Sequence, residues 1–138
     1  LEKMLQHPFF KKRHPKSTGK EVFNIKFIPK QLLRKSSYDV LATLTELTAR
    51  CIAKSLNSQK KLPDQGILCG GGSKNKFLIH SIQRLSKINL VSSSKFGFNP
   101  QAIEAMAFGW MARQRIYKNP LYVRDKKGLL GKITRSKQ

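Results

Sequence analysis

The chain has 138 residues, of which 28 are Lys or Arg and 7 are Asp or Glu, so its formal net charge is +21. This is the length of one domain, and such a chain could bury roughly two-thirds of its unfolded surface. The charge raises nucleic acid or an anionic surface as a partner. The basic residues are spread over the whole length, however, and no helix-turn-helix, RRM or zinc-knuckle pattern is present. We therefore expect no specific nucleic-acid binding, and keep a basic nucleic-acid or anionic-surface binding protein as an alternative.

Cysteine usage, histidine spacing and hydropathy indicate the compartment. Cys51 and Cys69 both stand in apolar sequence surroundings, which predicts small buried hydrophobic residues in a reducing compartment. The three histidines have no metal-ligand spacing, so no metal site is predicted. No apolar run approaches the roughly 18 residues of a membrane span, and no signal-peptide pattern is present. These features predict a cytoplasmic protein without membrane contact.

Residues 1–35 are expected to form an irregular lead-in. Pro8 and Pro15 should end any helix that begins at the first residue. The segment Lys16–Lys20 superficially resembles a phosphate loop, but its residue order is wrong and no strand precedes it. A surface turn is the favoured reading of that segment.

Residues 36–116 are expected to form the helix and strand core. The first long helix should start after the pair Ser36-Ser37, either of which can act as N-cap. Apolar residues then recur at intervals of four, three and four residues, which is the spacing of one helix face. The pattern predicts a helix to about Leu56 whose apolar face belongs to the core.

A glycine-rich turn stands at the centre of this core. Residues 67–69 are apolar and read as a short buried strand, Gly70, Gly71 and Gly72 follow, and a helical pattern opens at Phe77. Glycines allow a backbone to approach a ligand closely, and the next helix offers free N–H groups to a phosphate. A tight strand-to-helix turn without a ligand explains the same residues equally well. The glycines alone leave both readings open.

The order of elements predicts the fold class. The helix that opens at Phe77 should end near Ser86, and residues 88–91 read as a second strand. Strand, helix and strand in that order form a βαβ-like unit. An α/β fold with a parallel strand pair is therefore expected.

The last strong helix is expected to open at Asn99 as N-cap, with Pro100 at the first helical position. From residue 102 to residue 112 only Glu104 is neither apolar nor glycine. Such a helix should be buried on more than one side. Glu104 is then either a candidate site residue in a cleft or a first-turn glutamate that reaches solvent.

Residues 117–138 form a basic tail. Gly128–Ile133 could form a short closing strand, and Arg135–Gln138 should be frayed.

Four blocks of residues together resemble one family, the 1,6-anhydro-N-acetylmuramic acid kinases of bacterial cell-wall recycling. They are Pro15–Glu21 with Phe23-Asn24, Asp39–Ala49, Cys69–Asn75 and Glu104–Ala112. The blocks occur in the family's order, which is far more specific than any one of them. The resemblance covers roughly Pro8 to Ala112.

This resemblance implies the two-domain fold shared by actin, hexokinase and sugar kinases, with ATP and Mg²⁺ bound in the interdomain cleft. It implies that Gly70, Gly71, Gly72 and Asn75 belong to the adenosine side of the ATP site. It also implies that Glu104 lies near the anhydro-amino sugar. The chain would be the C-terminal portion of such a kinase.

Two features of the family do not occur in this sequence. The phosphate-binding segment Gly-Thr-Ser-x-Asp-Gly is not found, and the aspartate that serves as general base would lie upstream of the first residue. Phosphoryl transfer needs both. We therefore expect a C-terminal fragment that is inactive by itself and could assemble with a separate N-terminal kinase half. The chain would be one product of a split or decayed gene or an excerpt of a longer protein, and a remnant without function is a further alternative.

Overall fold

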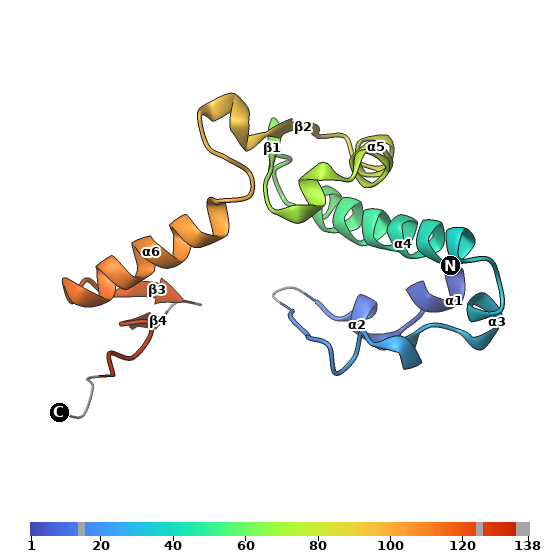
Figure 1. The fold of residues 1–138 in the computed structure, drawn as a ribbon, viewed down its shortest axis with the longest axis horizontal. Helices are drawn as coiled ribbons and strands as arrows, with labels where there is room; N and C mark the ends of the chain where they lie inside the picture. Colours follow the sequence, from blue (N-terminus) through green and yellow to red (C-terminus); the bar gives the residue numbers. More distant parts are fainter. Residues whose placement is uncertain (14–15, 124–125, 135–138) are drawn as a thin grey trace. The chain divides into compact units, whose positions relative to one another are not determined.

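The computed structural model describes residues 1–13, 16–123 and 126–134. The chain forms two compact units (Figure 1). The first unit comprises residues 1–67 and 72–91, and the second comprises residues 68–71 and 92–138.

The first unit holds five helices among the described residues. They are α1 (Glu2–Leu5), α2 (Pro8–Lys11), α3 (Lys30–Leu33), α4 (Ser37–Asn57) and α5 (Lys76–Leu85), with the 3-10 turn η1 (Ile25–Phe27). A further 3-10 turn, η2 (Gly71–Lys74), precedes α5. The strands β1 (Gln65–Leu68) and β2 (Asn89–Ser92) flank η2 and α5 in the chain.

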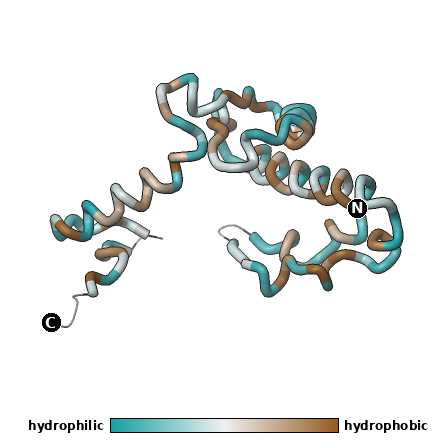
Figure 2. The backbone as a smooth tube through the Cα atoms, in the orientation of Figure 1, coloured by the Kyte–Doolittle hydropathy of each residue, from teal (hydrophilic) through white to brown (hydrophobic). Residues whose placement is uncertain are grey.

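The long helix α4 carries the core of this unit. It starts where the sequence predicts, because the Ser36 hydroxyl accepts a hydrogen bond of 3.1 Å from the Asp39 amide. Helix α4 packs against α5 and α3. Ala49 and Ala53 are almost fully buried one turn apart on α4, and Ile82 is buried on α5. Figure 2 shows α4 banded in apolar and polar residues along its length, as an amphipathic helix should be.

Strands β1 and β2 form a parallel pair connected through α5, so the predicted α/β character is confirmed to that extent. The predicted burial of the first strand is wrong. The strand begins at Gln65, Ile67 is 60% exposed, and Cys69 lies exposed beyond the strand end. A two-stranded sheet has two faces, and one crossover helix covers only one of them.

The sequence predicts an irregular lead-in, but in the structure this segment contains three short helices. Helix α1 ends at Leu5, before Pro8, as predicted, whereas Pro15 lies outside the described residues. Pro8 itself begins α2, and His7 caps that helix by accepting a 3.3 Å hydrogen bond from the Phe9 amide. An aromatic cluster joins α2 to the segment that leads into and includes η1, with ring centroids 5.0 to 6.5 Å apart. Its members are His7, Phe9, Phe10, Phe23 and Phe27.

Lys16–Lys20 leads into a surface turn, in agreement with the favoured reading. The Glu21 carboxylate accepts a hydrogen bond of 2.7 Å from the Gly19 amide and holds this turn. The hydrogen bonds that the carboxylate accepts lower the pKa of Glu21.

The second unit contains η3 (Ser93–Phe96), α6 (Ile103–Ile116), β3 (Leu121–Val123) and β4 (Lys126–Gly128). Strands β3 and β4 pair antiparallel, with Leu121 opposite Gly128. The predicted strand over residues 128–133 is wrong beyond residue 128, because the hairpin uses the residues before it. The expected fraying of residues 135–138 lies outside the described residues.

Helix α6 starts three residues later than predicted. Asn99 does cap, but it caps a turn: its side chain accepts from the Gln101 amide at 2.9 Å, and its carbonyl accepts from the Ala102 amide at 3.0 Å. The helix proper begins at Ile103. The capping chemistry of Asn99 agrees with the prediction, but the element that it begins is a turn and not the helix.

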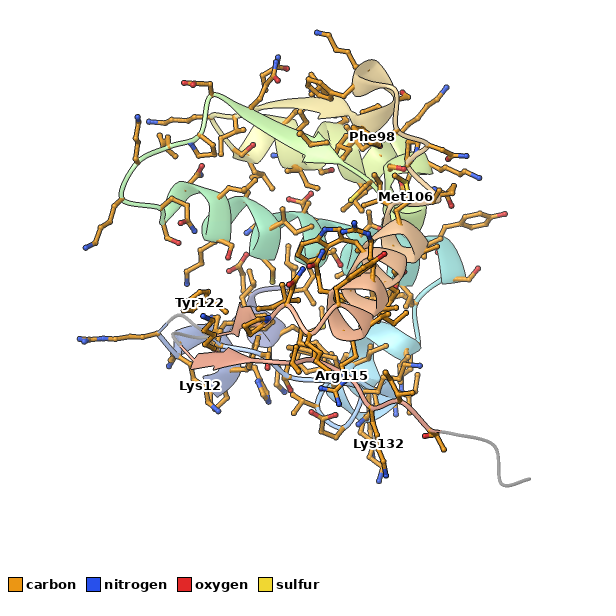
Figure 3. The ribbon with its side chains drawn as sticks, turned by 90° about the vertical axis from the view of Figure 1, so that its left-hand side faces the viewer. Lys12, Phe98, Met106, Arg115, Tyr122 and Lys132 are labelled. Carbon is orange, nitrogen blue, oxygen red and sulfur yellow. The ribbon has the colours of Figure 1, made fainter. Side chains whose placement is uncertain are left out.

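The expected burial of α6 on more than one side is also wrong. Phe108 is 62% exposed and Trp110 is 53% exposed, while Gln114 is the only buried residue of the helix. A helix that is apolar all round needs covering layers on every side. Besides α6, the elements described in the second unit are the turn η3 and the short β3–β4 hairpin. Figure 3 shows Met106 near the start of α6 and Arg115 near its end.

Candidate functional site

The glycine loop is held by hydrogen bonds on both sides of Gly70. The Gly70 amide donates to the Pro100 carbonyl at 2.7 Å, and the Gly70 carbonyl accepts from Gln101 Nε2 at 2.8 Å. The φ angle of Gly70 is +75°, in the left-handed region. Only glycine adopts this conformation without a steric penalty, so this position of the loop requires glycine for its backbone.

The next two glycines are not required by the packing of the chain. A Cβ atom built at Gly71 has no neighbour within 4 Å, and one built at Gly72 meets only Leu78 Cδ2 at 3.7 Å. Neither residue has a positive φ angle. What glycine provides at both positions is therefore an open backbone that another molecule can approach.

Asn75 links this loop to α5. It is the N-cap of α5, and its Oδ1 accepts a hydrogen bond of 3.0 Å from the Leu78 amide. Lys74 and Lys76 flank it and are both exposed. The free N–H groups at the start of α5 add to their positive potential, so this end of the helix favours an anionic group.

Glu104 lies in the first turn of α6 and is exposed. The described residues provide it with no ion pair. The structure brings the start of α6 to the glycine loop, because Gly70 is bonded to Pro100 and Gln101, directly ahead of the helix. Of the predicted site residues, Gly70, Gly71 and Glu104 belong to the second unit, whereas Gly72 and Asn75 belong to the first.

Gln101 is the residue that the sequence did not reveal. Its side chain reaches back 31 positions along the chain to hold the loop. No periodicity or motif marks a single glutamine after an Asn-Pro turn. Its role follows from the hydrogen bond that it donates.

The described residues do not include a group of three or more His, Cys, Asp or Glu side chains that could hold a metal ion. Mg²⁺ is held by carboxylates, water and phosphate oxygens. Because one or two carboxylates together with substrate phosphates are the usual magnesium ligands, the ion would be held here largely through a bound nucleotide. No helix among the described residues is both long enough and apolar enough to cross a membrane.

Comparison with known proteins places the chain. The family model described as anhydro-N-acetylmuramic acid kinase matches residues 1–134. An anhydro-N-acetylmuramic acid kinase from Gamma-proteobacterium EBAC31A08 is 43% identical over 141 residues, which covers 99% of this chain and 39% of that protein. The kinase of the same name from Idiomarina loihiensis is 42% identical and covers 87% of this chain. That from Pseudomonas syringae pv. syringae is 44% identical and covers 81%.

The chain spans about a third of the length of these relatives, between 32% and 39%. The match nevertheless extends over almost the whole of the chain itself, including the glycine loop and the helix that carries Glu104. The chain belongs to the anhydro-N-acetylmuramic acid kinase family.

Proposed function

We propose that this chain supplies the adenosine side of an ATP site, and part of the sugar cleft, in an anhydro-N-acetylmuramic acid kinase. The reaction opens the 1,6-anhydro ring with water and transfers a phosphoryl group from ATP, giving N-acetylmuramic acid 6-phosphate in peptidoglycan recycling. The observation that carries the proposal is the family match over residues 1–134, combined with two loop glycines that the chain's own packing does not require.

Each proposed residue has a distinct role. Gly71 and Gly72 leave room for the adenosine portion of ATP to lie against the backbone. Gly70 sets the direction of the loop through its left-handed conformation, and Asn75 fixes the start of the following helix. Glu104, exposed in the first turn of α6, would accept hydrogen bonds from hydroxyl groups of the sugar.

The reaction also needs groups that this sequence does not contain. Water must be activated by a base, and the triphosphate must be held by a phosphate loop and Mg²⁺. We therefore propose that the active species also contains the N-terminal half of such a kinase, which can be supplied in an experiment as a separate protein. ATP and the anhydro-amino sugar are the proposed ligands.

The test measures phosphorylation of 1,6-anhydro-N-acetylmuramic acid by ATP and Mg²⁺. The samples are this chain alone, the N-terminal portion of the Gamma-proteobacterium relative alone, and the two mixed. We expect activity in the mixture only. If both proteins are folded and the mixture is inactive, the kinase proposal fails and a remnant without function is the better description.

Two glycine variants test the loop within the same assay. Gly71→Ala adds a Cβ where the chain has open space, and Gly128→Ala does the same in β4 as a matched control. Both should leave the circular dichroism and the melting temperature unchanged. Gly71→Ala should raise the KM for ATP about tenfold, which corresponds to about 1.4 kcal/mol of lost binding. Equal KM values for the two variants would exclude Gly71 from the nucleotide site.

Glu104 is tested through the sugar. Glu104→Gln keeps the shape of the side chain but removes its charge, and hydrogen bonds to charged groups contribute about 1.5–3 kcal/mol. We expect at least a tenfold loss in kcat/KM for the sugar in the mixture, with the KM for ATP unchanged. A variant that behaves like the unmodified chain would place Glu104 outside the sugar cleft.

The formal charge of +21 favours one alternative, a basic protein that binds nucleic acid or an anionic membrane surface. Its affinity would fall steeply with salt, because contacts to phosphates release counterions. Binding of single-stranded DNA or anionic vesicles, measured between 50 and 200 mM salt, would change by about 10³-fold or more if many phosphates are contacted. Binding of DNA or vesicles that does not change with salt would exclude this alternative.

A further inference from the structure

Two adjoining cavities of the first unit are lined by residues of the N-terminal segment and of α4. One has a volume of about 720 Å³ and is called here the basic cavity. The other has a volume of about 620 Å³ and is called the apolar cavity. Four residues line both of them: Phe9, Phe10, Cys51 and Ile52. The two cavities therefore form one continuous groove, and neither volume is unusual for a small-molecule site.

The basic cavity carries a strong excess of positive charge. Among the described residues, its lining includes six cationic side chains and no carboxylate; the cations are Lys11, Lys12, Arg13, Lys16, Arg50 and Lys54. Figure 3 labels Lys12, which follows α2. Like charges gathered in this way repel one another, and a bound anion would relieve that repulsion.

Two of these cations are already engaged. Arg50 pairs with Glu2 at 2.8 Å and with Glu46 at 3.2 Å. Lys16 donates to the carbonyls of Phe9 and Phe10 at 3.2 and 3.1 Å, and its Nζ lies 5.0 Å from the Phe9 ring centroid. The remaining four form no ion pair with a described residue, so their charge is available to a ligand.

The apolar cavity has the opposite character. None of the described residues that line it is charged, and its walls come from the aromatic cluster, η1 and α4. Ile25 is 64% exposed there and Phe23 is 36% exposed. Burying these surfaces under an apolar ligand would remove them from water, whereas a free inorganic anion could not do so.

Cys51 stands at the junction of the two cavities. Burial raises the pKa of the Cys51 thiol, while the charges of Lys16 and Lys54 act in the opposite direction. The electrostatic field of the basic cavity therefore reaches the point where the apolar cavity begins.

We propose that this groove binds a single-chain amphiphile with an anionic head, of the alkyl phosphate or alkyl carboxylate type, as a monomer. The head lies among Lys12, Lys54 and their basic neighbours, and the chain lies in the apolar cavity along α4. A neutral lipid would leave the cations unpaired, and a nucleic acid would leave the apolar cavity empty. The inference is independent of the kinase function proposed above, because it uses none of the residues assigned to that site.

The test uses the thiol at the junction as its reporter. The Cys69→Ser variant of the full chain leaves Cys51 as its single thiol, and its rate of modification by iodoacetamide is measured against increasing octyl phosphate below its critical micelle concentration. We expect saturable protection. Hexyl phosphate, which is two methylenes shorter, should protect about fifteenfold more weakly, because each buried methylene contributes about fourfold in affinity. Inorganic phosphate and 1-octanol should protect far less than octyl phosphate at the same concentration.

A matched pair of charge variants separates a specific site from general attraction to a basic protein. Lys12→Gln with Lys54→Gln removes two charges that line the basic cavity, and Lys60→Gln with Lys61→Gln removes two exposed charges outside it. The first pair should weaken protection by octyl phosphate at least tenfold, and the second should leave it unchanged. Circular dichroism verifies that both are folded.

Four outcomes would overturn the proposal. They are no protection of the folded chain, equal losses in the two lysine pairs, no dependence on alkyl length, and equal protection by inorganic phosphate or single-stranded DNA. Protection by anionic vesicles but not by monomeric octyl phosphate would show a membrane surface as the ligand instead, and would also contradict the monomeric site.

Discussion

Gln101 donates a 2.8 Å hydrogen bond from its Nε2 to the carbonyl oxygen of Gly70. The amide of Gly70 in turn donates to the neighbouring Pro100 carbonyl at 2.7 Å, so both polar groups of this glycine are satisfied by one turn. The loop after β1 and the turn before α6 are thereby fixed to one another. A glycine in the left-handed region is held in place by a side chain far away in sequence.

The first prediction concerns this contact. Gln101→Glu replaces the donor Nε2 with an acceptor, so Gly70 loses a hydrogen bond that contributes about 1 kcal/mol. We expect faster amide hydrogen exchange at Gly70 in the chain alone. In the mixture with an N-terminal half, the KM for ATP should rise about fivefold while kcat changes little.

Gln83→Glu is the matched control, because Gln83 is exposed on α5 and the charge change is the same. Exchange at Gly70 that is equally slow in both variants would show that Gln101 does not hold the loop. The exchange measurement remains informative even if the mixture has no kinase activity.

The second prediction concerns Glu46, whose carboxylate ties helices together. Arg84 Nη2 lies 3.0 Å from both of its oxygens, and Arg50, which also pairs with Glu2 of α1, lies 3.2 Å away. Burial opposes ionisation of this carboxyl, but the hydrogen bonds from the two arginines outweigh it and lower the pKa of Glu46. Its stabilising effect is therefore present above the pKa of the unfolded chain and is lost as the pH falls through the lower folded value.

Glu46→Gln should lower the free energy of unfolding by about 1 kcal/mol at neutral pH, as expected for a partly exposed ion-pair network. The difference from the unmodified chain should vanish in acid. Urea unfolding at several pH values measures both effects, with the exposed Asp64→Asn as control. A difference that persists unchanged at low pH would mean that packing, and not charge, explains the loss.

The third prediction concerns the pH dependence of Cys51. Because burial raises the pKa of this thiol, the folded chain should form the reactive thiolate only at a higher pH than the unfolded chain does. The raised pKa of the Cys51 thiol contributes to the stability of the folded chain. This contribution is fully present below the pKa of the thiol in the unfolded chain, and it is lost as the pH rises through the pKa in the folded chain.

The measurement is the rate of alkylation of Cys51 in the Cys69→Ser variant, followed against pH with and without urea. Folding should move the profile to higher pH and slow the reaction. The exposed Cys69, measured in Cys51→Ser, should be modified faster than Cys51 in the folded chain. Coincident profiles for folded and unfolded Cys51 would contradict the assigned burial.

The fourth prediction concerns Ser86 at the end of α5. Its hydroxyl is buried and has no hydrogen-bond partner among the described residues. Ser86→Ala removes that unpaired polar atom and should raise the free energy of unfolding by about 1 kcal/mol. Ser58→Ala, which removes a 2.9 Å hydrogen bond to the Ser55 carbonyl, should not raise it. Chemical denaturation measures the free energy of unfolding of both variants. A lower value for Ser86→Ala than for the unmodified chain would mean that the hydroxyl has a hydrogen-bond partner.

Sequence alone determined the elements whose signals lie within a few residues. Ser36 and the apolar spacing after it set the start and length of α4, because a cap and a helix face are local properties. The glycine loop and the four ordered blocks likewise indicated the family that the comparisons show. The kinase roles of Gly71, Gly72, Asn75 and Glu104 remain predictions.

Only the tertiary structure decided which element each local signal begins and which residues are buried. The Asn99 side chain accepts a backbone hydrogen bond, as an N-cap residue does, but it caps a turn. Gly70 is hydrogen-bonded to this turn, and α6 starts after it. The four-residue helix α2 packs in an aromatic cluster with residues in and before η1, because a helix of four residues has too few hydrogen bonds to be stable alone. Burial was the least predictable property: Cys69 and the apolar residues of α6 are exposed. Burial depends on which layers cover a residue, and those layers come from distant parts of a chain.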